Sequence, residues 1–242
     1  MDKVIDTAQL KAYADGIGVA LEEGMLGQFD RYAEILLDWN SRMNLTAITK
    51  PEEMVVKHFV DSLTLLTVLK VPQGAKGIDV GTGAGFPGVP VKIARPDVQL
   101  TLLDSLNKRV NFLQALSQAL GQENLCLHAR AEEAGRKDGM REQYDFATAR
   151  AVAHLRELSE YCLPFVRAGG YFAAMKSGQA EQELEEAKAA IRLLGGKVEQ
   201  VEKMQLPDGS GRSIILIKKI SQISSKYPRP SAKIAKFPLN GG

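Results

Sequence analysis

The chain has 242 residues, of which 45% are hydrophobic and 25% are charged, and its formal net charge is +2. This composition is typical of one sizeable globular domain, or of one domain with a small cap, and no internal repeat or low-complexity segment is visible. No stretch approaches about 18 apolar residues, and the first residues lack the basic flank and apolar region of a signal peptide. We therefore expect a cytoplasmic protein with no membrane contact.

Residues that commonly bind metals are few. Cys126 and Cys162 both lie in apolar surroundings, so we expect buried free thiols rather than a disulfide. His58, His128 and His154 lie far apart, with no cysteine or carboxylate at ligand spacing. The sequence therefore predicts no metal site.

Residues 1–71 are expected to form an N-terminal helical cap. Apolar residues recur at three- and four-residue spacing over residues 7–21, 26–37 and 51–69. Four polar residues of this cap are candidates for a function: Asn44, His58, Asp61 and Ser62. His58 and Asp61 are three residues apart and share a helix face, so we interpret them as a hydrogen-bonded pair that fixes the cap, with a functional role as the alternative.

The next segment is a short apolar strand that leads into a glycine-rich turn over residues 81–88. Glycines are needed where a strand leads into a helix across a nucleotide, because a Cβ would block close approach of the backbone. The turn also fits the G-x-G-x-x-G dinucleotide pattern. Asp79 can meet an ammonium or a ribose, and Pro87 removes an N–H that would hold a pyrophosphate, so S-adenosylmethionine (SAM) is favoured over NAD.

Strand and helix patterns then alternate to the end of the domain, which we expect to cover residues 72–220. Strands are predicted over residues 76–80, 98–104, 125–129, 144–149, 170–175, 197–205 and 212–219. Helices are predicted over residues 88–95, 108–120, 153–163 and 180–194. The short link between the last two strands makes them antiparallel. A parallel sheet with an antiparallel edge hairpin predicts the α/β, Rossmann-like fold of class I SAM-dependent methyltransferases, with seven strands.

Several strands end in residues suited to a ligand site. Asp104 ends the second strand, about 20 residues beyond the glycine-rich turn, where a doubly wound fold places the acid that holds a ribose diol. After the third strand, a backbone N–H and an acid of residues 130–133 are placed to grip an adenine edge. Arg150 and Lys176 follow the fourth and fifth strands, at the sheet edge where such folds bind ligands.

The charge distribution separates the C-terminal end from the rest of the chain. All 29 acidic residues lie at or before Asp208, whereas seven of the 31 basic residues follow it. A basic tail, residues 221–242, suggests that a polyanion is bound at one edge, with a solubilising tail as the alternative.

Taken together, these motifs resemble the RsmG (GidB) family, the 16S rRNA guanine-527 N7-methyltransferases, over nearly the whole chain. The shared blocks are Trp39-Asn40 to Asn44-Leu45-Thr46, His58-Phe59-Val60-Asp61-Ser62-Leu63, Asp79 to Gly88, Arg130-Ala131-Glu132-Glu133, Ala149-Arg150-Ala151 and Lys226-Tyr227-Pro228-Arg229. The Gly-Phe-Pro-Gly ending of the turn and the N-terminal blocks are specific to this family. Other SAM enzymes share only the glycine-rich turn and the acid.

The resemblance implies a SAM site and an RNA face. With the residues singled out above, the expected SAM site is Asp79, Gly81, Gly83, Gly85, Phe86, Asp104, Ala131, Glu132 and Arg150. The expected RNA-binding residues are Lys108, Arg130, Lys176, Arg212, Lys226 and Arg229. The implied partner is 16S rRNA or the 30S subunit, and nothing in the sequence indicates a dimer, so a monomer is expected.

Guanine N7 carries no proton, so no general acid or base is predicted, and Arg150 and Lys176 would act by positioning the base. Three other functions stay open: SAM-dependent methylation of another RNA, a protein or a small molecule; NAD-dependent oxidation; and RNA binding without catalysis. A small-molecule or protein substrate would leave the basic tail without a use. Asp79 and Pro87 argue against NAD-dependent oxidation, and the complete set of cofactor positions argues against RNA binding without catalysis.

Overall fold

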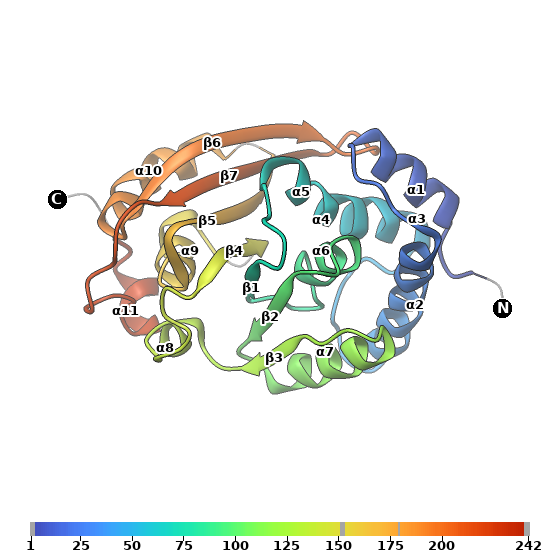
Figure 1. Cartoon of the computed structure of the whole chain (residues 1–242), viewed down its shortest axis with the longest axis horizontal. Helices are drawn as coiled ribbons and strands as arrows, with labels where there is room; N and C mark the ends of the chain where they lie inside the picture. The colour runs from blue at the N-terminus through green and yellow to red at the C-terminus, as the bar shows by residue number, and fades with distance from the viewer. Residues whose placement is uncertain (1–2, 151–152, 179, 240–242) are drawn as a thin grey trace.

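The computed structural model describes residues 3–150, 153–178 and 180–239 and contains a twisted seven-stranded sheet (Figure 1). Ala151 of the blocks quoted above and the last three residues of the tail lie outside this part of the chain. The strands are β1 (Lys76–Val80), β2 (Gln99–Asp104), β3 (Leu125–His128), β4 (Tyr144–Arg150), β5 (Val166–Ser177), β6 (Gly196–Gln205) and β7 (Gly211–Lys219). Their order in the sheet is β3-β2-β1-β4-β5-β7-β6.

The sheet is parallel from β3 to β5, and β7 pairs antiparallel with both β5 and β6. This confirms the predicted methyltransferase architecture with its antiparallel edge hairpin. Because β1, β2, β4 and β5 run in the same direction, their carboxyl ends meet at one edge. Asp104, Arg150 and Lys176 therefore lie at a common edge of the sheet.

The larger helices follow the predicted pattern, while two short ones were not predicted. The described helices are α1 (Thr7–Gly16), α2 (Glu23–Asn40), α3 (Pro51–Met54), η1 (Val55–Val60), α4 (Asp61–Leu63), α5 (Leu65–Val68), α6 (Gly88–Ala94), α7 (Asn107–Ala119), α8 (Ala131–Ala134), α9 (Leu155–Cys162), α10 (Glu181–Leu193) and α11 (Ser231–Lys236). The short helices α8 and α11 were missed because four to six residues hold too little apolar periodicity to detect.

The helix predicted over residues 51–69 is interrupted by the π-helix η1. π-helical turns are rare and frequently occur at functional sites. Two hydroxyls bond to backbone carbonyls at this point: Ser62 Oγ donates to His58 O (2.6 Å) and Thr64 Oγ1 donates to Asp61 O (2.5 Å). The interruption places both His58 and Asp61 in buried positions.

The cap and one face of the sheet share a single hydrophobic core. Buried side chains of α2 and η1, including Phe29, Tyr32 and Phe59, belong to the same apolar cluster as Phe112 of α7 and Phe146 of β4. The predicted boundary at residue 71 is therefore a chain connection, and the two parts it separates are packed together. Figure 1 shows α1 to α5 lying along one side of the sheet.

The C-terminal segment packs on the opposite face, together with α9 and α10. Ile223, Tyr227, Ile234 and Leu239 are buried in the second apolar cluster, which also contains Phe165. The segment carries three exposed lysines, but its apolar residues belong to the core of the domain. It is not a free tail.

Ion pairs and hydrogen bonds also hold this segment. Arg229 Nη2 lies 2.7 Å from Glu160 Oε2, and Arg229 Nε and N both donate to Glu160 Oε1. Glu160 is completely buried, and its hydrogen bond raises the pKa of Arg229. Arg141 donates to the carbonyls of Ile223 and Tyr227. Arg229 was expected to bind RNA, and that role stays a prediction, although its Nε and Nη2 donate to Glu160 within the protein.

The Arg229–Glu160 pair provides a test of how firmly the segment is anchored. Arg229→Ala would leave a buried carboxylate without its partner, which typically costs about 3–5 kcal/mol of unfolding free energy. Lys226→Ala is the matched control, because Lys226 is exposed and its loss should change the unfolding free energy by less than about 0.5 kcal/mol. Urea unfolding followed by circular dichroism measures both, and equal stability of the two variants would contradict the anchoring role.

Candidate functional site

Three adjoining cavities lie at the carboxyl edge of the sheet. We name each by one lining residue: the Glu132 cavity (about 280 Å³), the Phe86 cavity (about 380 Å³) and the Lys176 cavity (about 530 Å³). The Glu132 and Phe86 cavities share Gly81 and Asp104. The Phe86 and Lys176 cavities share His58 and Arg150. The arrangement can hold a two-part ligand along the first two cavities and a second molecule in the third.

The glycine-rich turn covers a buried carboxylate. Asp79 is completely buried, and its Oδ2 accepts hydrogen bonds from Thr82 Oγ1 (2.6 Å) and Gly88 N (2.9 Å). Burial, opposed by these hydrogen bonds, raises the pKa of Asp79 to about 6. The expected contact of Asp79 with an ammonium or a ribose stays a prediction: Oδ2 is used within the turn, and Oδ1 has no hydrogen-bond partner among the described residues.

This carboxylate also explains the start of α6. The N–H of Gly88 donates to Asp79, so the helix N-terminus does not present that group to a phosphate. A Cβ on Gly88 would lie 2.8 Å from Asp79 Oδ2, and one on Gly85 would lie 2.7 Å from the Tyr32 hydroxyl. These two glycines are required by packing within the protein. Gly83 has a φ of +60° and open space around it, so it leaves room for a ligand.

Asp104 separates the Glu132 and Phe86 cavities. Its side chain is 2% exposed, Oδ1 accepts from Leu106 N (2.9 Å) and Oδ2 accepts from Gly83 N (3.0 Å). A longer contact of 3.4 Å joins Oδ2 to Arg109 Nη1. A carboxylate has about four acceptor sites. Asp104 can therefore accept from a ligand hydroxyl, and from a second one if Arg109 moves away.

The Glu132 cavity is lined by α8 and by Glu157 and Tyr161 of α9. Arg130 Nε donates to Glu132 Oε1 (2.7 Å), and the Arg130 side chain is 55% exposed. Arg130, which was expected to bind RNA, therefore lies at the rim of the cavity whose other residues were expected to bind the cofactor. Ala131 lines the same cavity, so the residues expected to contact an adenine edge lie together.

Phe86 joins the turn to the cap. Its ring stacks on His58 (centroids 4.3 Å apart, planes at 17°) and on Tyr32 (5.2 Å, 14°). The guanidinium of Arg150 lies 4.9 Å from the centre of the same ring. The Tyr32 hydroxyl donates to Ala84 O (2.5 Å), which fixes α2 to the turn. Tyr32 was not singled out from the sequence, because it lies within the apolar periodicity of its helix.

His58 is a neutral residue in this site. Burial, followed by the nearby Arg150 charge, lowers the pKa of His58 to about 3. Its Nε2 lies 2.9 Å from Thr46 Oγ1 and its Nδ1 lies 3.4 Å from Arg150 Nη2. Because an arginine can only donate, Nδ1 is the acceptor and Nε2 carries the proton. The predicted pair with Asp61 is wrong in its detail, since Arg150 joins the two residues.

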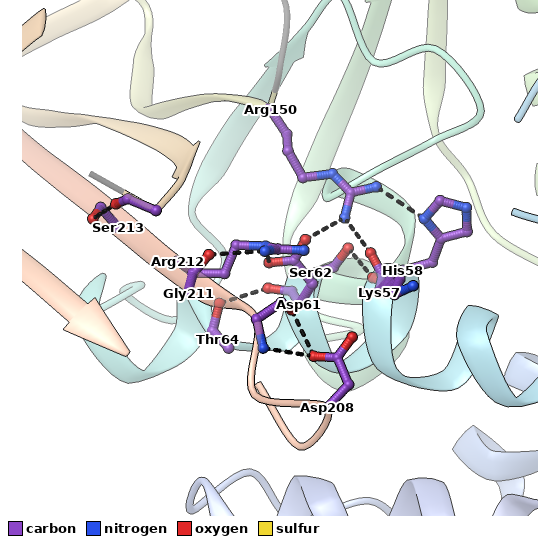
Figure 2. A network of polar contacts seen from close by, with 12 residues as sticks. Lys57, His58, Asp61, Ser62, Thr64, Arg150, Asp208, Gly211, Arg212 and Ser213 are labelled. Carbon is purple, nitrogen blue, oxygen red and sulfur yellow. Dashed lines mark hydrogen bonds and ion pairs between the residues drawn. The ribbon is translucent and has the colours of Figure 1, made fainter. Parts of the chain in front are cut away.

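A buried carboxylate binds two arginines from different strands (Figure 2). Asp61 Oδ2 lies 3.0 Å from Arg150 Nη1, and Asp61 Oδ1 lies 3.1 Å from Arg212 Nε. Arg150 also donates to Lys57 O (3.2 Å). The contact of Asp61 with both arginines was not predicted, since 89 and 151 residues separate the partners in the sequence.

Lys176 and Lys108 differ in their surroundings. Lys176 Nζ donates to Ala153 O and to Glu183 Oε1, both at 2.6 Å, and its side chain is 10% exposed in the wall of the Lys176 cavity. Lys108 is exposed in the first turn of α7 and lines none of the three cavities. Glu183, which holds Lys176, had no sequence signal, because it lies in a highly charged helix.

Cys126 and Cys162 are free thiols; Cys162 is buried, as predicted, whereas Cys126 is only partly buried. Within residues 3–150, 153–178 and 180–239, no group of three histidine, cysteine or acidic side chains could hold a metal ion. In the same part of the chain, no helix is both long and apolar enough to cross a bilayer.

Comparison with known proteins gives matches over nearly the full length. A family model described as GidB, rRNA small subunit methyltransferase G, matches residues 25–214. Ribosomal RNA small subunit methyltransferase G of Desulforamulus reducens is 48% identical and covers 96% of this chain and 98% of its own. The protein of the same description from Symbiobacterium thermophilum is 46% identical, with coverages of 99% and 100%.

Solved structures with the same fold are more distant in sequence. A SAM dependent methyltransferase from Aquifex aeolicus is 18% identical, with a TM-score of 0.50 over 69% of this chain and 93% of that chain. TrmN from Thermus thermophilus is 16% identical, with a TM-score of 0.51 over 72% of this chain and 55% of that chain. These similarities support the fold alone.

The low pKa of His58 predicts how its contribution to stability changes with pH. The unfolded imidazole takes up a proton near pH 6.5, whereas the folded one does so only near pH 3. The contribution of His58 to the free energy of unfolding is therefore fully present above pH 6.5 and is lost as the pH falls toward 3. The stability difference between the wild type and His58→Gln should shrink by about 2 kcal/mol from pH 7 to pH 5.

Comparison with the variant removes an opposite effect of Asp79. The pKa of Asp79 is higher in the folded state, so the folded protein binds a proton at this carboxylate at a higher pH than the unfolded chain does. The contribution of Asp79 to the free energy of unfolding therefore rises as the pH falls from about 6 toward 3.8. Both proteins contain Asp79, and its contribution cancels in the difference. Chemical unfolding at pH 5, 6 and 7 gives the measurement, and a pH-independent difference would show that the buried imidazole is not kept neutral.

Proposed function

The chain belongs to the GidB family, described as rRNA small subunit methyltransferase G, and on this premise we propose that it transfers a methyl group from SAM to N7 of guanine 527 in 16S rRNA. The substrate is 16S rRNA or the 30S subunit. The alternative is SAM-dependent methylation of another RNA or a small molecule. The observation that carries the proposal is the shared wall of the Phe86 and Lys176 cavities, formed by His58 and Arg150.

The residues that line the Glu132 and Phe86 cavities suit the chemical groups of SAM. Ala131 and Glu132 would contact the adenine, and Asp104 would accept from the ribose hydroxyls. Gly81, Gly83 and Phe86 line the Phe86 cavity, where the methionine part would lie. SAM supplies an electrophilic methyl group. Asp79 would support this site by shaping the turn.

The target guanine would enter the Lys176 cavity. Arg150 and Lys176 carry N–H donors in its wall, and guanine offers O6 as an acceptor beside N7. A-form RNA buries N7 in a deep, narrow groove, so the guanine would be presented from a loop. Exposed or rim cations near these cavities, such as Lys57, Arg130 and Lys108, are placed to contact phosphates, and Lys226 is a more distant candidate.

The reaction needs alignment more than proton transfer. N7 has a lone pair and no proton, and the neutral His58, with a pKa of about 3, is a hydrogen-bonding group rather than a base. Holding N7 in line with the methyl carbon and sulfur contributes up to about 7–11 kcal/mol in well-oriented systems. Arg150 would position the base, and the stack of Phe86 on His58 would exclude water.

Asp104→Asn should weaken SAM binding about 10- to 100-fold, because hydrogen bonds to a charged acceptor contribute about 1.5–3 kcal/mol. Affinity for 16S rRNA should stay nearly unchanged. Isothermal titration calorimetry with SAM measures the effect. Asp97→Asn is the matched control, since Asp97 pairs with Arg95 away from the three cavities. Equal SAM affinity of the two variants would show that Asp104 does not hold the ribose.

Arg150→Ala should lower methyl transfer from labelled SAM into 30S subunits or 16S rRNA by about 100- to 1000-fold, as for the loss of one oriented donor at a reacting centre. His58→Gln should act mainly through stability. Steady-state transfer by the folded variants is the measurement. A greater loss of transfer from a stably folded His58→Gln than from Arg150→Ala would overturn the assignment of roles.

The position of the methyl group is tested separately. Chain cleavage selective for 7-methylguanosine, followed by primer extension, should place the label at guanine 527 of 16S rRNA. A methyl group found at any other atom or nucleotide would rule out the proposed target, while leaving a methyltransferase of different specificity.

A further inference from the structure

We propose that Asp61 is a positioning residue for methyl transfer, which fixes Arg150 and Arg212 in the wall of the Lys176 cavity. The inference rests on the proposed function, because it concerns the cavity assigned there to the target base. Asp61 would act through the two arginines and would not itself contact the reacting atoms.

The geometry gives each oxygen of Asp61 a separate partner. Oδ2 lies 3.0 Å from Arg150 Nη1, at the end of β4, and Oδ1 lies 3.1 Å from Arg212 Nε, near the start of β7. The side chain of Asp61 is only 5% exposed. Figure 2 shows the two guanidinium groups converging on Asp61 from different elements. Asp61, a residue of the cap, therefore sets the distance between Arg150 of β4 and Arg212 of β7.

Charge explains why the carboxylate is needed. Two guanidinium groups with no anion between them repel each other, and the repulsion is strong in a partly buried site. The side chains of Arg150 and Arg212 are 15% and 19% exposed, so solvent screens them little. One carboxylate between two cations leaves a net charge of +1 on this cluster, and with Lys57, Lys176 and Glu183 the wall of the cavity carries +2. That surplus suits an electron-rich purine edge or a single phosphate.

Both arginines also keep donors for a substrate. Arg150 uses Nη1 and Nη2, and Arg212 uses Nε and Nη1, in contacts with the protein. Among the described residues, Arg150 Nε and Arg212 Nη2 have no hydrogen-bond acceptor. Both side chains line the Lys176 cavity. Asp61 thus fixes the arginines through some of their donors and leaves others for an incoming nucleotide.

A purely structural ion pair between cap and sheet would use the same contacts, but the cap has other attachments. The Tyr32 hydroxyl binds Ala84 O, and Phe29 and Phe59 lie in the core shared with the sheet. We therefore expect Asp61 variants to fold. A test must separate loss of arginine placement from loss of stability.

The test compares Asp61→Asn with Asp208→Asn in methyl transfer to 30S subunits. Asp208 is exposed near Arg212 and bonds to Ser210, so its variant removes the same charge without touching the arginines. We expect Asp61→Asn to lower kcat about 100-fold, as for a misplacement of about 1 Å. Its SAM affinity by calorimetry should stay within about twofold, and Asp208→Asn should stay within about threefold of the wild type in both. Wild-type kcat in a folded Asp61→Asn would overturn the proposal.

A mutant cycle gives a readout that a structural role would not produce. If Asp61 acts through its two arginines, Asp61→Asn should lower transfer by no more than about threefold in a background that carries both Arg150→Gln and Arg212→Gln. A loss in that background as large as the one in the wild type would contradict the proposal. Should Asp61→Asn fail to fold, Asp61→Glu retains the charge and displaces the arginines; full activity of that variant would equally overturn it. Absence of transfer by the wild type would instead refute the proposed function.

Discussion

The packing of Phe86 against the cap is the contact on which the site depends. The ring holds Tyr32 and His58 on its faces and lies under the guanidinium of Arg150. It therefore joins the glycine-rich turn, the cap and the end of β4 in one contact. The same ring lines the cavity assigned to the methionine part of SAM. The cavities that we propose for the cofactor and for the target base meet because the cap is held at this edge of the sheet.

Buried carboxylates define the shape of the site around this contact. Asp79 accepts hydrogen bonds from the glycine-rich turn, and Asp104 lies between the Glu132 and Phe86 cavities. Asp61 binds the two arginines in the wall of the Lys176 cavity. The oxygens of Asp61 and Asp104 accept from arginine or backbone donors, which offsets the cost of burying a charge. Asp79 differs, because its Oδ1 has no hydrogen-bond partner among the described residues and burial raises its pKa to about 6. These contacts hold the turn and the two arginines in place, which suits a reaction that depends on alignment.

The sequence was sufficient for the sheet, its order of elements and the placement of Asp104 and Arg150, because each depends on local periodicity or on a strand end. It was insufficient for contacts between distant segments. The bonds of Asp61 to Arg150 and Arg212 could not be predicted, and neither could the burial of Glu160 against Arg229. The packing of the basic C-terminal segment was likewise beyond the sequence, since charge counts cannot show that its apolar residues enter the core; its contact with a polyanion stays a prediction.

A crystal structure of the complex with S-adenosylhomocysteine tests the central claim most directly. The account predicts the adenine in the Glu132 cavity, the ribose hydroxyls within hydrogen-bond distance of Asp104, and the sulfur next to Phe86, open toward the Lys176 cavity. A ligand bound in the Lys176 cavity, or one that makes no contact with Asp104, would contradict it.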